Sequence, residues 1–164
     1  MSFVSVLTLI HTAISLVAIA AGAVAMLGLF RGGSFRSWTN VFLLTATLTS
    51  LTGFAFPLGG VTPAQITGAI ALVILAIVLV AYYRFRVARA WRWIYAAGMV
   101  ASLYLLVFVG VVQAFQKIAF LSDLAPTQSE LPFVVAQAAT LAFFVGLGTM
   151  AARRYRPEVV AARF

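Results

Sequence analysis

The basic residues of this chain are confined to short segments that separate long apolar stretches. All 11 Lys and Arg residues except Lys117 fall into three clusters. The clusters are Arg31 with Arg36; Arg84, Arg86, Arg89 and Arg92; and Arg153, Arg154, Arg156 and Arg163. A charged side chain is costly in the hydrocarbon of a bilayer, whereas cytoplasmic loops are enriched in Lys and Arg. The pattern therefore predicts a multi-pass membrane protein.

The composition indicates the same class of protein. Hydrophobic residues make up 64% of the 164 residues and charged residues only 9%, whereas soluble domains have about 25% charged residues. In a soluble protein a net charge of +8 would suggest nucleic-acid binding. Here the loop arginines of a membrane protein account for that charge, so we expect no nucleic-acid partner. The chain has no cysteine, which excludes disulfides and cysteine-ligated metal sites.

Five segments are long and apolar enough to cross a bilayer, which takes about 20 helical residues. They are Phe3–Phe30, Trp38–Pro57, Pro63–Tyr83, Trp93–Phe115 and Pro132–Ala152. The first is longer than the roughly 7 to 15 apolar residues of a secretory signal and has no preceding Lys or Arg, so we expect it to be retained. The sequence thus predicts an all-α, polytopic membrane protein with a single bundle of five transmembrane helices and no internal repeat.

The basic clusters also predict the orientation of the bundle. They follow the first, third and fifth predicted helices, which places all three on one side of the membrane. The positive-inside rule makes that side cytoplasmic, with the N-terminus out and the C-terminus in, and we expect a bacterial inner (plasma) membrane. Neighbouring aromatic residues are typical of an interfacial belt: Trp38, Tyr82, Tyr83, Trp91, Trp93, Tyr95 and Tyr155. Anionic lipid headgroups are the expected partners of the second cluster, which comprises Arg84, Arg86, Arg89 and Arg92.

Local signals mark two helix starts. Thr62 is followed by Pro63 and then by Gln65, which is the pattern of a capping box with proline at the first helical position. Thr127 and Glu130 have the same spacing ahead of the last predicted helix, and we expect them to form a second capping box.

Polar side chains within the predicted spans gather toward the outer side. Counting about 1.5 Å per residue places His11 about 12 Å inside the first helix, with Thr49 and Thr140 at comparable depth. Polar groups in hydrocarbon pair inside a bundle or line a wet cavity. We therefore expect a polar cup that opens outward. Its candidate ligand-binding residues are His11, Thr49, Thr52, Gln113, Gln137, Thr140 and Glu130.

His11 is the main candidate because it is the one readily ionisable residue well inside a predicted span. It shares a helix face with Ser15, Ala18, Gly22 and Ala25, a stripe of small residues that lets another helix approach closely. The alternative interpretation is that His11 only hydrogen-bonds across that interface. The threonines have a similar alternative, in which each hydroxyl returns to the backbone carbonyl one turn earlier.

Several classes of function remain open. The first is a non-enzymatic bundle whose cup binds a small ligand, a lipid headgroup or a partner subunit, including a second copy of the chain. The second is a channel or transporter subunit, although the spans lack the acidic residues common in coupled transport. The third is a membrane redox protein that binds quinone or haem. A single His disfavours haem, which usually takes two strong axial ligands, and no cofactor is firmly predicted.

An enzymatic role is disfavoured by the placement of the acids. Catalysis at His11 would need a base and an orienting acid close together. Asp123, Glu130 and Glu158 all lie outside the predicted spans, so no catalytic residue and no metal site is predicted.

Overall fold

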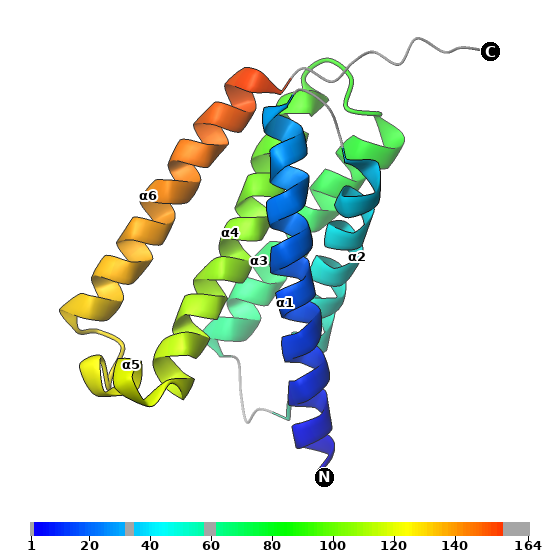
Figure 1. The fold of residues 1–164 in the computed structure, drawn as a ribbon. Coiled ribbons are helices and arrows are strands. Elements are labelled where there is room, and N and C mark those ends of the chain that lie inside the picture. Colours follow the sequence, from blue (N-terminus) through cyan, green and yellow to red (C-terminus); the bar gives the residue numbers. More distant parts are fainter. Residues whose placement is uncertain (1, 32–34, 58–61, 156–164) are drawn as a thin grey trace.

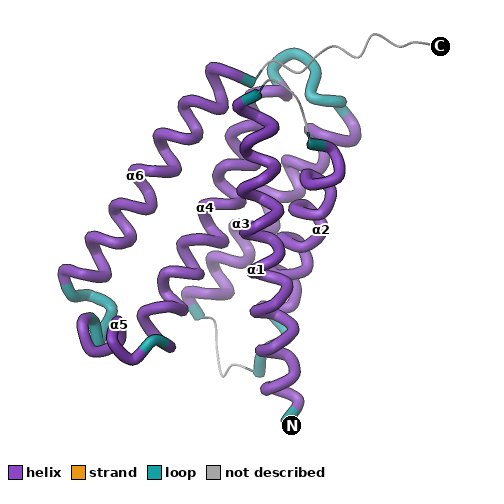
Figure 2. The backbone as a smooth tube through the Cα atoms, in the orientation of Figure 1, coloured by secondary structure: helices purple, strands orange, loops and turns teal. Residues whose placement is uncertain are grey.

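The chain folds as a bundle of antiparallel helices, and the all-helical fold is confirmed (Figures 1 and 2). The structure is a computed structural model that describes residues 2–31, 35–57 and 62–155. The elements are α1 Phe3–Phe30, α2 Arg36–Gly53, α3 Pro63–Leu79, the π-helical turn η1 Val80–Arg84, α4 Trp91–Lys117, α5 Ala119–Leu124 and α6 Leu131–Arg154. Helices α1 to α4 contact one another in a closed ring, whereas α6 packs mainly on α4, with a smaller contact to α1.

Four of the described helices are long and apolar enough to cross a membrane, which suggests a membrane protein. They are Phe3–Phe30, Pro63–Arg84, Trp91–Lys117 and Leu131–Arg154. The predicted second span corresponds to α2, which is not among them. Its 18 residues include Arg36, Asn40 and several hydroxyl side chains, which lower its mean hydropathy. Helix α2 nevertheless runs alongside α1 and α3 from one end of the bundle to the other (Figure 1).

The hydroxyls of α2 are mostly satisfied within the helix itself. Thr45, Thr47 and Ser50 each donate to the carbonyl four residues earlier, at 2.7, 2.7 and 3.0 Å. These bonds agree with the alternative interpretation of the threonines, in which each hydroxyl returns to a backbone carbonyl of its own helix. Because these bonds need no partner from another helix, α2 can present polar residue types to an apolar environment.

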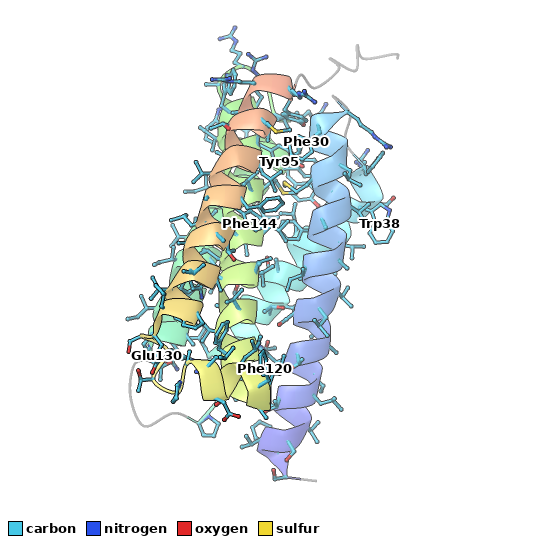
Figure 3. The ribbon with its side chains drawn as sticks, turned by 60° about the vertical axis from the view of Figure 1, so that its left-hand side comes forward. Phe30, Trp38, Tyr95, Phe120, Glu130 and Phe144 are labelled. Carbon is cyan, nitrogen blue, oxygen red and sulfur yellow. The ribbon has the colours of Figure 1, made fainter. Side chains whose placement is uncertain are left out.

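The two ends of the bundle differ in charge. The C-terminal ends of α1 and α6, the N-terminal ends of α2 and α4, and the 85–90 loop share one end, where nitrogen-tipped side chains gather (Figures 1 and 3). We call this the basic end; Arg156 and Arg163 lie outside the described residues. The opposite end, which we call the far end, carries the start of α1, helix α5 and the 125–130 loop. Asp123 and Glu130, the acids of the described part, are at the far end.

Small residues on α1 bring the ring of helices together. Ala18, Gly22 and Ala25 are buried, as expected from the small-residue stripe, and Ala21 is buried beside them. A Cβ added at Gly22 would lie 2.7 Å from a Leu103 methyl on α4 and 2.8 Å from the Phe42 ring on α2. Helix α1 therefore touches two neighbours at a point where only glycine fits.

Aromatic residues close the core at the basic end. Tyr95 is fully buried and stacks on Tyr82 with ring centroids 5.5 Å apart. Tyr155, which follows α6, lies 5.6 Å from Tyr95 and is 3% exposed. These two tyrosines are thus core residues rather than members of a headgroup belt, and Tyr155 fastens the end of α6 to the bundle. Trp38 and Trp93 remain exposed.

The close packing of α3 and α4 gives a prediction about stability. A Cβ added at Gly98 would overlap the Val78 side chain, which is fully buried and, being β-branched, stiff in a helix. We expect Gly98→Ala to lower the free energy of unfolding by about 1–3 kcal/mol. Denaturation in detergent micelles, followed by tryptophan fluorescence, measures this change. Gly146→Ala is the matched control, because nothing lies within 4 Å of its added Cβ. Equal stability of the two variants would contradict the packing argument.

Candidate functional site

His11 is held against α2 near the far end of the bundle. Its Nδ1 lies 2.8 Å from the Thr52 hydroxyl, and its ring meets the Phe56 ring edge-on at 5.4 Å. The Thr52 hydroxyl donates to the Leu48 carbonyl at 2.8 Å. Its oxygen is therefore free to accept a hydrogen bond from the Nδ1–H of a neutral imidazole. In this tautomer the lone pair is on Nε2, which makes no hydrogen bond within the described part of the chain.

Ser15 and Thr49 continue the polar contact one turn further in. Ser15 donates to the carbonyl of His11 at 2.7 Å, and the Thr49 hydroxyl lies 3.4 Å from the Ser15 oxygen. Thr49 is buried at this interface. Of the predicted site residues, His11, Thr49 and Thr52 are therefore brought together, between α1 and α2.

The predicted glutamines form a second group, on α4 and α6. The Gln137 amide donates to the Phe108 carbonyl at 3.2 Å, and its buried Oε1 has no partner among the described residues. Gln113 reaches Gln116 at 3.5 Å on its own helix. Thr140 donates to the Ala136 carbonyl within α6. In the described ranges no hydrogen bond joins this group to the His11 group.

Glu130 organises the turn that precedes α6. Its carboxylate accepts from the Thr127 hydroxyl at 2.9 Å and from the backbone N–H groups of Thr127 and Ser129 at 3.1 Å each. Desolvation raises the pKa of this carboxyl, but these hydrogen bonds together outweigh it, and the pKa is lowered. Of the expected capping box only the bond from the Glu130 carboxylate back to the Thr127 N–H is present. It does not cap a helix, because α6 begins at Leu131 and Glu130 is itself the N-cap, with no side-chain cap bond.

The 85–90 loop at the basic end has an unusual backbone. Arg86, Val87 and Arg89 have φ values of 46°, 58° and 51°, in the left-handed region that β-branched residues avoid. The loop is held by the Val87 N–H, which donates to the Ala81 carbonyl at 3.0 Å, and by the buried Val87 side chain. Such strain persists only where surrounding packing enforces it.

Arginine side chains on either side of this loop lie over aromatic rings. The Arg92 guanidinium is 4.6 Å from the Trp93 ring, and that of Arg84 is 5.8 Å from the Phe85 ring. Phe85 in turn stacks on Trp91 with centroids 4.0 Å apart. No arginine forms an ion pair with a carboxylate in the described chain. No carboxylate therefore neutralises the residues that we predicted to bind lipid headgroups, which are Arg84, Arg86, Arg89 and Arg92.

Two hollows in the described bundle have no predicted ligand-binding residue in their lining. The first, of about 260 Å³, lies between α1, α4 and α6 and is lined by apolar side chains. The second, of about 230 Å³, lies between α2 and the α3–η1 segment. In its lining the Tyr83 hydroxyl donates to the Asn40 side-chain oxygen at 3.0 Å. Sequence reasoning missed both hollows, because they arise where helices diverge and no residue pattern marks them.

The Glu130 turn gives a prediction about pH. Because the pKa of Glu130 is lower in the folded state, its contribution to the turn is present above the ordinary glutamate pKa and is lost as the pH falls through the folded-state pKa. We expect the protection of the Thr127 and Ser129 amides, measured relative to their intrinsic exchange rates, to fall over that acidic range. Hydrogen-exchange mass spectrometry of the 125–131 segment measures it. In Glu130→Gln this loss of protection should vanish, and a loss that persists would contradict this role for the carboxylate.

No protein-family model, curated protein or solved structure matches this chain. The described residues also contain no group of three or more His, Cys, Asp or Glu side chains that could hold a metal ion. The functional assignment therefore depends on the contacts of His11, on the glutamine group and on the basic end.

Proposed function

We propose that this chain is a non-enzymatic membrane protein that binds a small ligand at the far end of its bundle, through the imidazole of His11. The supporting observation is the Nδ1 contact with Thr52, which leaves Nε2 as a hydrogen-bond acceptor on a half-buried ring. A group placed in this way recognises a ligand that carries a hydroxyl or N–H donor. Phe56 supplies an aromatic wall beside it.

Space beside His11 is consistent with this role. A Cβ at Gly53 would lie 3.8 Å from the Cε1 atom of His11, so the glycine leaves the ring uncrowded from that side. Thr49 and Ser15 lie on the core side of His11. Gln113 and Gln137 lie on α4 and α6, and we propose that they complete the rim of the cup when a ligand is bound.

The threading that accompanies this function has five crossings. With α1 ending at the basic end and α3 starting at the far end, the intervening α2 has to pass from one end to the other. Its 18 residues span about 27 Å, close to the thickness of the hydrocarbon core. The positive-inside rule then places the basic end in the cytoplasm and His11 toward the outer leaflet of a bacterial inner membrane.

The His11 proposal is tested by what is purified with the protein. We expect mass spectrometry of organic extracts to find a compound with the wild-type chain that is depleted at least about tenfold in His11→Leu, since a buried hydrogen bond and its orienting group are lost. Thr12→Ala, an exposed position beside it, is the control and should retain the compound. Identical extracts from all three proteins would refute the proposal. An extract with quinone absorption would instead favour the redox alternative.

The threading is tested with single cysteines, because the natural chain has none. We introduce one at Ala88 in the basic loop or at Ser129 in the far-end loop, both exposed positions. In intact cells a membrane-impermeant maleimide should label the Ser129→Cys protein and spare the Ala88→Cys protein. Inverted membrane vesicles should reverse that result. Labelling of Ala88→Cys from outside would overturn the orientation, whatever the outcome at His11.

A further inference from the structure

The apolar hollow between α1, α4 and α6 occupies the half of the bundle nearest the basic end. Ala23, Leu27 and Phe30 line it from α1, and Phe144 and Leu147 line it from α6. Figure 3 shows Phe30 and Phe144 in the region where these two helices face each other. Its lining is apolar throughout, so in a membrane it suits a hydrocarbon chain rather than a polar molecule.

On both α1 and α6, an arginine follows the residues that line the hollow, at a spacing that keeps it on the same face of its helix. On α1, Arg31 follows Leu27 by four residues, and the backbone N–H of Arg31 donates to the Leu27 carbonyl. On α6, Arg154 follows Leu147 by seven residues, with Ala151 between them on the same face. Residues four and seven apart lie on one side of a helix. An arginine therefore stands above each wall, and Arg154 is about 15 Å along the axis from Phe144.

These arginines have no acidic partner within the described residues. Asp123 and Glu130 are at the far end, and both guanidinium-bearing residues are exposed. The adjacent ends of α1 and α6 are helix C-termini, whose carbonyls repel an anion. Recognition of a negative group at this place therefore depends on the arginine side chains, which match a phosphate by paired N–H donors.

We propose that the hollow binds one acyl chain of an anionic phospholipid, with the lipid phosphate held between Arg31 and Arg154. The charge of the two arginines selects the headgroup, and the apolar lining selects the chain. The segment from Arg84 to Arg92 adds a general attraction for anionic lipid at the same end. The hollow beside it, which Leu79 and Tyr83 line, also exposes the polar side chains of Asn40 and Thr47 and suits a hydrocarbon chain less well. This site is separate from His11, and it requires only that the bundle is embedded in lipid.

The test counts lipids bound to the whole chain in detergent, by native mass spectrometry during titration with phosphatidylglycerol. We expect the double variant Arg31→Gln/Arg154→Gln to weaken binding of the first lipid by at least about tenfold, because charge-assisted hydrogen bonds to phosphate are lost. Arg84→Gln/Arg86→Gln removes the same charge from the same end and should weaken binding of the first lipid by less than about threefold, because it lowers only the general attraction of that end for anionic lipid.

A second pair of variants tests the hollow. Ala23→Phe places a ring in it and should also weaken binding by about tenfold, since the apolar surface for the chain is filled. Ala76→Phe is the matched control, because Ala76 is exposed on α3 at a similar distance from the basic end. All variants are compared for helicity and for a monodisperse profile on gel filtration. The double arginine variant alters only exposed side chains, so it keeps the test decisive even if Ala23→Phe misfolds.

Two further titrations distinguish an anionic phospholipid from a neutral phospholipid and from free phosphate. Phosphatidylcholine should bind at least about tenfold more weakly than phosphatidylglycerol, since it carries no net charge, and inorganic phosphate should not displace the lipid. Equal losses from the two arginine pairs would reduce the site to general charge attraction and overturn the proposal. Displacement by phosphate alone would overturn it as well. A dimer that Ala23→Phe abolishes would assign the hollow to a second copy of the chain instead.

Discussion

The structure depends on one constraint, which is that hydrocarbon offers no water to satisfy a polar group. Backbone amides must then be bonded within helices, and charges must move to the ends. Helix α2 shows how the constraint is met by residues that look unsuitable. Thr45, Thr47 and Ser50 return their hydroxyls to their own helix, so a segment of modest hydropathy can pack between α1 and α3. The same constraint leaves one end of the bundle basic and gives the other the acids of the described part.

Helix positions followed from the sequence because the hydropathy of a segment is a local property. Helix α1 was predicted at its observed limits, Phe3–Phe30, and the Thr62 capping box is present as expected. Features set by tertiary packing were not predictable in this way. No sequence pattern indicated α5, or that Tyr155 would pack against Tyr95 in the core. The turn before α6 was misjudged because the helix begins at Leu131 and not at the residue after Thr127, so that the backward bond from Glu130 to the Thr127 N–H closes a turn ahead of the helix.

The depth of the candidate-site residues in the bundle was predictable from the sequence, but their hydrogen-bond partners were not. Counting along the helices placed His11 and Thr49 at one level, and the contacts of α1 with α2 bring them together through Ser15. The same count gave no information about which helices are neighbours. Helix α6 docks on α4 instead of entering the ring; Gln137 therefore bonds to Phe108 rather than to the His11 group. The cup itself remains a prediction.

The loose attachment of α6 is understandable only if lipid is treated as part of the structure. Phe144 and Ala151 are the buried residues of this helix, a surface that would be too small to hold a helix in water. In a bilayer the exposed remainder costs nothing, because lipid tails are as apolar as the side chains they touch. Tyr155 at one end and Gln137 near the other connect it to the rest of the bundle. In the site that we propose, a hydrocarbon chain fills the hollow beside this helix, and the arginines above its walls select the lipid.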